Sequence, residues 1–237
     1  MLISHRKKFI FIKTVKTAGT SLESYFEPYC MPEGEWVQEH ARETHVSEAG
    51  IVGFRGTRAK DETWYNHMPG RKIRDQIGDE VWNSYYKFTS IRNPYDKLVS
   101  YFMARWAKYQ HQGTSSRWKT LAGRTFNVGN PIYRTRGDTD IELFRSWVKH
   151  GGEVMDRDKY MIDEQVCVDF FIRYEHLHND LRQVCDHLSI PFDLSRLPKF
   201  KMGHRKAIPL EDYYDDKTLK IVQEKYAWEL HRFNYSL

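Results

Sequence analysis

The sequence predicts an α/β fold built on a parallel sheet, and three observations lead to this prediction. A short apolar run at residues 9–12 has the length of a strand that is buried on both faces. Apolar residues at helical spacing follow it, and a second strand-then-helix unit begins near residue 86. Strands that alternate with helices are typical of parallel sheets, in which ligands bind at the carboxyl ends of the strands.

A turn rich in small residues and hydroxyls lies between the first strand and a helix predicted to begin near Gly19 or Thr20. Backbone N–H groups at a helix start have no partner within the helix and carry partial positive charge, so such a turn can hold a phosphate or a sulfate. Gly19 lets the backbone approach an anion, and Lys16 adds an ammonium. Thr20 and Ser21 add hydroxyl donors. The alternative is an ordinary turn with a surface lysine, because short glycine motifs have many false positives.

The second strand-to-helix turn follows a strand predicted over residues 86–90. Asn93 is a favoured N-cap residue and a proline follows it, so a helix is predicted to begin there. Arg92 ends the strand, and Ser100 lies about two turns into the helix. A planar guanidinium with a hydroxyl suits capture of a phosphate. Alternatively, Arg92 pairs with Asp96, and Ser100 bonds to its own helix.

The rest of the chain is predicted to alternate in the same way within a single domain, residues 1–237. Helices are expected around Ile73 and Ile77 and over residues 141–150, 177–188 and 215–232, and strands near residues 51–54 and 169–174. Residues 107–139 and 197–209 are interpreted as basic loops, and long loops of this kind often bind ligands or cover a site.

The composition limits which kinds of ligand and cellular setting the sequence favours. The 237 residues carry a formal net charge of +5, which mildly favours anionic ligands but is too dispersed to indicate nucleic acid. The three cysteines lie far apart, so neither a metal site nor a disulfide framework is expected, and a reduced, cytoplasmic setting fits best. No apolar run is long enough for a membrane span.

Taken together, these units resemble the sulfotransferases that use 3′-phosphoadenosine 5′-phosphosulfate (PAPS), above all the branch of Golgi carbohydrate sulfotransferases and their bacterial relatives. Residues 16–22 (KTAGTSL) look like that family's 5′-phosphosulfate loop, and residues 88–101 (FTSIRNPYDKLVSY) look like its 3′-phosphate segment. Residues 169–177 (DFFIRYEHL) resemble its later strand and helix start. The likeness extends from about residue 7 to about residue 235.

The resemblance implies a P-loop-like sulfotransferase domain with helices on both faces of its sheet. PAPS would be the co-substrate and adenosine 3′,5′-bisphosphate the product, with a hydroxyl of a carbohydrate or small molecule as acceptor. The residues that would bind PAPS are Lys16, Thr17, Ala18, Gly19, Thr20, Ser21, Arg92, Ser100, Arg205 and Lys206.

Two catalytic residues are expected from the same resemblance. Lys16 would stabilise charge that grows on the leaving oxygen, and His67 would take the acceptor proton, since a neutral histidine works near pH 7. The residues after His67 match the family only loosely, and a loop histidine bonded to backbone is the alternative. His45, His40 and Glu62 are the reserve bases.

Two other functions stay open on the sequence alone. One is a nucleotide kinase-like phosphotransferase that uses ATP, although the first turn lacks the G-x-x-x-x-G-K-[ST] pattern that such enzymes carry. The other is a nucleotide-binding module without catalysis.

Overall fold

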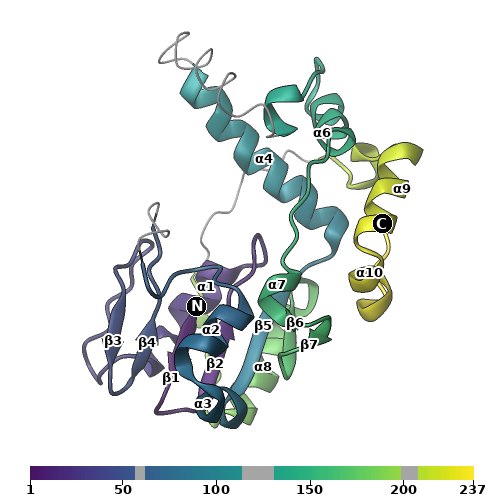
Figure 1. Cartoon of the computed structure of the whole chain (residues 1–237). Helices are drawn as coiled ribbons and strands as arrows, with labels where there is room; N and C mark the ends of the chain where they lie inside the picture. The colour runs from purple at the N-terminus through teal and green to yellow at the C-terminus, as the bar shows by residue number, and fades with distance from the viewer. Residues whose placement is uncertain (57–61, 114–130, 199–207) are drawn as a thin grey trace. The chain divides into compact units, whose positions relative to one another are not determined.

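The structure is a computed structural model that describes residues 1–56, 62–113, 131–198 and 208–237 (Figure 1). The chain divides into two compact units. The first comprises Met1–Arg92 and Met155–Phe200, and the second comprises Asn93–Val154 and Lys201–Leu237. The expectation of a single domain stays a prediction.

A six-stranded sheet forms the centre of the first unit, in the order β3-β4-β1-β2-β5-β8. Its strands are β1 (Leu2–Ser4), β2 (Phe9–Ile12), β3 (His45–Ser47), β4 (Gly50–Val52), β5 (Tyr86–Ile91) and β8 (Phe170–Arg173). The strands β2, β5 and β8 run parallel, whereas β1, β3 and β4 pair antiparallel. The α/β class is therefore confirmed. The antiparallel half was not foreseen; β1 reaches β2 through a turn too short for a parallel crossover.

Helices and a short hairpin accompany this sheet in the first unit. The helices are α1 (Gly19–Phe26), α2 (Gly70–Ile77), α3 (Asp79–Ser84), α7 (Arg157–Tyr160) and α8 (Leu177–His187), and β6 (Met161–Ile162) pairs with β7 (Gln165–Val166). The phenylalanines Phe9, Phe11 and Phe88 share one buried cluster with apolar residues of α1 and α8. All four residues of β2 are buried, as its apolar run predicted. In Figure 1, α2 and α3 lie in front of the sheet.

The second unit is helical in its described part. It contains α4 (Pro94–Gly113), α6 (Asp140–Lys149), α9 (Asp216–Lys225) and α10 (Ala227–Phe233), with short 3-10 turns at Pro131–Arg134 and Glu211–Tyr213. Phe144 packs edge-on against Phe102, Tyr213 and Tyr214. No helix among the described residues has both the length and the apolar character that crossing a membrane requires.

Two predicted boundaries in this unit are wrong. The loop expected from residue 107 begins later, because α4 continues to Gly113. The closing helix expected over residues 215–232 is two helices, since the backbone leaves helical geometry at Tyr226. The Tyr226 hydroxyl accepts a hydrogen bond from the Val154 backbone at 2.8 Å, so a tertiary contact fixes the residue at the break.

Candidate active site

The turn between β2 and α1 has an unusual backbone. Lys16 (φ 63°) and Ala18 (φ 61°) both adopt left-handed conformations, which cost a non-glycine residue roughly 1–2 kcal/mol each. Alternation of left- and right-handed residues turns successive N–H groups toward one point and makes an anion-binding concavity. The helix that follows begins at Gly19, as predicted, and adds the unpaired N–H groups of its first turn. The local geometry fits a phosphate or a sulfate.

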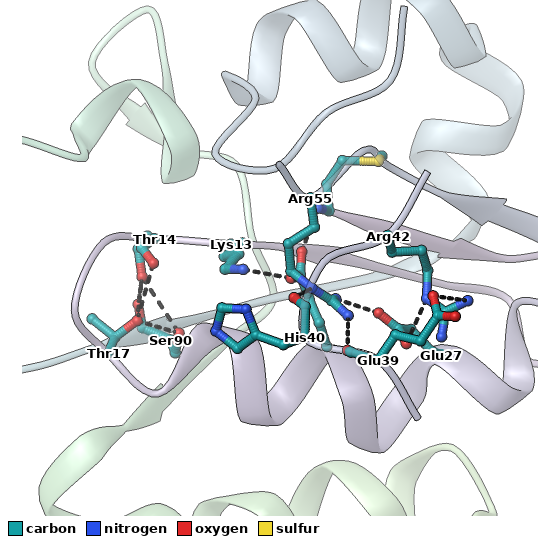
Figure 2. Close-up of polar contacts among 11 residues, drawn as sticks. Lys13, Thr14, Thr17, Glu27, Glu39, His40, Arg42, Arg55 and Ser90 are labelled. Carbon is teal, nitrogen blue, oxygen red and sulfur yellow. Dashed lines mark hydrogen bonds and ion pairs between the residues drawn. The ribbon is translucent and has the colours of Figure 1, made fainter. Parts of the chain in front are cut away.

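Buried hydroxyls hold this turn against the sheet (Figure 2). The Thr17 hydroxyl lies 2.8 Å from that of Thr14 and 2.7 Å from that of Ser90. Thr14 also donates to the Ser90 carbonyl on β5. All three side chains are buried, so these bonds are shielded from competition with water. The network ties the turn to the neighbouring parallel strand.

Arg92 directly follows β5 and reaches the same turn. Its Nη1 donates a hydrogen bond to the Lys16 carbonyl at 3.0 Å. Its guanidinium carbon lies 4.1 Å from the ring centroid of Tyr174, within the range of a cation–π contact. The structure therefore places Lys16 and Arg92 together at the carboxyl ends of β2 and β5, as the alternating pattern predicted.

His67 lies just before α2 in a left-handed conformation, with φ 59°. Its Nδ1 is buried, and no hydrogen-bond partner for this atom occurs among the described residues. Burial, and to a smaller extent the Lys13 charge, lower the pKa of His67 to about 3, although Glu23 and Asp156 oppose the shift. The imidazole is therefore neutral at pH 7, and the alternative of a ring bonded to backbone through Nδ1 is not observed in this part of the chain.

A buried chain of charges lies beside the turn (Figure 2). Lys13 Nζ is 2.5 Å from Glu23 Oε2, and Arg55 Nη1 is 3.1 Å from the same oxygen. Arg55 also pairs with Glu27, whose other oxygen accepts from Arg42 Nε at 3.1 Å. Burial alone would raise the pKa of Glu23, but the charges of Lys13, the Met1 amino group and Arg55 together lower it. Glu23 is therefore a carboxylate and not a proton donor.

The residue after Arg92 is the predicted helix cap, and three further predicted binding residues lie beyond it in the sequence. Asn93 caps α4 as expected, because its Oδ1 accepts from the Tyr95 N–H at 3.1 Å. Ser100 lies on α4 in the second unit, so its place beside Arg92 stays a prediction. Arg205 and Lys206 lie outside the described residues.

The three reserve bases have different surroundings. His45 is on β3, which β4 and β1 separate from β2, a distance of roughly 14 Å at the usual strand spacing. The side chain of His40 is exposed, and its backbone carbonyl accepts from Arg55 at 2.7 Å. Glu62 accepts from the Thr44 hydroxyl at 2.7 Å. The charges of Lys13, Glu23 and Asp156 act on the His67 imidazole, so His67 stays the proposed base.

Sequence reasoning missed several residues that build the site. Lys13 follows the apolar strand directly, and Ser90 occupies a strand position, so neither carries a motif of its own. Tyr174 and Asp156 are far from the turn in sequence, and only the fold brings them near it. A lysine at the end of a buried strand could have been noted, because burial of its ammonium requires a paired carboxylate.

Comparison with protein families gives one result. A family model described as "Sulfotransferase family" matches residues 1–236. Comparisons with curated proteins and with solved structures find no match.

Proposed function

The chain belongs to the sulfotransferase family, and we propose that it transfers the sulfuryl group of PAPS to a hydroxyl of a carbohydrate or another small molecule. The single observation that carries the proposal is the hydrogen bond from Arg92 to the backbone of Lys16, which brings the arginine to the first turn. This arrangement supplies two cationic side chains and a concave set of N–H groups at one edge of the sheet. A nucleotide with phosphates at both ends requires such a pair of anion sites.

Binding is assigned to the turn and to the arginine. The residues from Lys16 to Ser21 would hold the 5′-phosphosulfate through N–H groups, hydroxyls and the Lys16 ammonium. Arg92 would hold the 3′-phosphate, because a planar guanidinium matches the geometry of phosphate oxygens and carries a permanent positive charge. When bound, PAPS supplies an activated sulfuryl group. Ser100, Arg205 and Lys206 are proposed to complete the 3′-phosphate site.

Catalysis is assigned to His67 and Lys16. His67 is neutral at pH 7 and can therefore accept the proton of the acceptor hydroxyl. Its pKa of about 3 makes it a weak base in the free protein. A bound anion adds negative charge nearby and raises the pKa of an imidazole, which strengthens the base when the site is filled. The Lys16 ammonium stabilises negative charge on the leaving oxygen.

The experiment that tests this function has two parts. Adenosine 3′,5′-bisphosphate at millimolar concentration should raise the melting temperature, since a ligand that binds the folded state stabilises it. ATP should produce a smaller shift. Labelled PAPS is then incubated with a panel of sugars, phenols and lipids, with and without chelator. Sulfated product formed without magnesium supports the proposal.

Other outcomes decide against it. No thermal shift with the bisphosphate would remove the proposed nucleotide. A shift without transfer to any acceptor would favour a binding module that has lost catalysis. Magnesium-dependent phosphate transfer from ATP would favour the kinase-like alternative.

A further inference from the structure

Asp156 is a buried carboxylate to which the proposed chemistry gives no role. Its side chain is 1% exposed, and its Oδ2 accepts a hydrogen bond from the Val15 N–H at 3.0 Å. Val15 directly precedes Lys16 in the turn, although 141 positions of sequence separate it from Asp156. A distant carboxylate therefore fixes the backbone at the point where the turn enters its left-handed geometry.

Two features of Asp156 within its own helix are weaker than its bond to Val15. Asp156 occupies the N-cap position of α7, yet its side chain makes no capping hydrogen bond to the described residues of that helix. Lys159 Nζ lies at the outer limit of an ion pair, 4.0 Å from Oδ1. The short bond to Val15 is thus the closer of these two contacts, and it points to the turn.

The same short helix also contacts the segment that carries His67. A Cβ added to Gly70, the first residue of α2, would lie 2.8 Å from the Lys159 carbonyl and 3.2 Å from Cys167 Sγ. Backbone from α2 and backbone from α7 therefore approach closely, and Gly70 permits this. His67 lies three residues before that contact, and the Asp156 charge acts on its imidazole.

We propose that Asp156 is a positioning residue. It fixes the position of the turn that contains Lys16 relative to residues 67–69, the segment that carries His67 and precedes α2. It does so by accepting the Val15 N–H while its own helix packs against the start of α2. This inference rests on the proposed function for its catalytic meaning. The geometric part concerns the chain alone and can be tested without substrate.

The test compares Asp156→Ala, Asp156→Asn and, as a matched control, Asp158→Ala. Asp158 lies on the same helix, but its carboxylate is exposed and contacts Lys159. Exchange of the Val15 amide, followed by NMR, reports the hydrogen bond directly. Titration with adenosine 3′,5′-bisphosphate and steady-state kinetics report the site.

Asp156→Ala should speed Val15 exchange and weaken bisphosphate binding, each by about tenfold or more, as loss of a hydrogen bond to a charged acceptor predicts. Asp156→Asn should restore both toward the native values, because an amide oxygen also accepts from Val15. Asp158→Ala should match the native protein. In Asp156→Ala, kcat should fall together with affinity, since Lys16 and His67 would no longer be held in fixed positions relative to each other.

Native Val15 exchange and native affinity in folded Asp156→Ala would overturn the proposal. So would a folded Asp156→Asn that behaves like the alanine variant, since charge rather than the accepted bond would then matter. If the alanine variant does not fold, the asparagine variant decides by the same two measurements. A native protein that binds no bisphosphate would contradict the proposed function. The exchange rate of the Val15 amide would still decide whether Asp156 positions the turn.

Discussion

Arg92 donates a hydrogen bond from Nη1 to the backbone carbonyl of Lys16 at 3.0 Å. The two residues are brought together by parallel pairing of β2 with β5, in which Ile12 lies opposite Thr89. Lys16 follows its strand by four residues, and Arg92 directly follows the last residue of β5. The arginine thus supports the backbone of the turn that contains Lys16. In our proposal its positive charge also binds the 3′-phosphate of the nucleotide.

Replacement of Arg92 should weaken nucleotide binding even when charge is kept. Arg92→Lys retains a cation but loses the planar fork that reaches Lys16 and stacks on Tyr174. We expect the Kd for adenosine 3′,5′-bisphosphate to rise by about 10- to 100-fold, as loss of a charge-assisted hydrogen bond predicts. Calorimetric titration measures it. Arg74→Lys is the control, because Arg74 pairs at the surface with Asp79. Equal affinities for the native and Arg92→Lys proteins would contradict the phosphate role.

Lys16 should matter more for turnover than for folding. Lys16→Asn removes the ammonium and places a residue that tolerates left-handed geometry at φ 63°. We expect kcat for sulfuryl transfer to fall by about 100-fold or more, in line with loss of one group that stabilises transition-state charge. Lys8→Asn is a matched control, since Lys8 is an exposed lysine that is also left-handed, with φ 51°. A Lys16→Asn enzyme with native kcat would remove Lys16 from the mechanism.

His67→Asn should slow turnover by about 10²–10⁴-fold while nucleotide binding persists. Asparagine suits the left-handed backbone at His67 better than alanine, so the change isolates the loss of the base. Loss of a general base typically costs about 10²–10⁴-fold in rate. Single-turnover transfer from PAPS and bisphosphate titration measure the two properties separately. Retained turnover would end the role of His67 as base.

The same variant should alter the pH dependence of stability. The folded-state pKa of His67 is about 3, below the ordinary histidine value, so the unfolded chain binds this proton more readily. The contribution of His67 to stability is therefore present at neutral pH and is lost as pH falls from about 6.5 toward 3. The slope reaches at most about 1.4 kcal/mol per pH unit. Urea unfolding at pH 7, 6 and 5 should show a smaller loss for His67→Asn than for the native protein; identical losses would contradict the buried neutral imidazole.

Lys13→Met should have two linked effects. It leaves Glu23 buried with one fewer cation, and breaking such a buried pair costs about 3 kcal/mol of unfolding free energy. It also removes a charge that lowers the pKa of His67, so this pKa should rise, which NMR titration of the imidazole measures. Lys225→Met is the control, because Lys225 pairs with Glu153 at the surface, where ion pairs contribute less than about 1 kcal/mol. An unchanged His67 pKa in Lys13→Met would show that the buried charges of Lys13 and Glu23 do not influence the proposed base.

The local elements of the site could be predicted from sequence because their signals are local. The apolar run of β2, the glycine that begins α1 and the Asn-Pro start of α4 each act through neighbouring residues, and all three were found where expected. The antiparallel strands β1 and β3 were missed because each is only three residues long and includes polar residues, whereas β4, equally short, lies in the apolar run that predicted it. So short a segment shows no periodicity that distinguishes a strand from a loop.

By itself, the sequence determined the α/β class, the two strand-to-helix turns and the family, because each depends on residue types at short spacing. The tertiary structure alone decided which partners hold those turns. Val15 bonds to Asp156, Lys13 pairs with Glu23, and Arg92 stacks on Tyr174. Such contacts arise when the sheet brings distant segments to one edge, and no spacing along the chain encodes them.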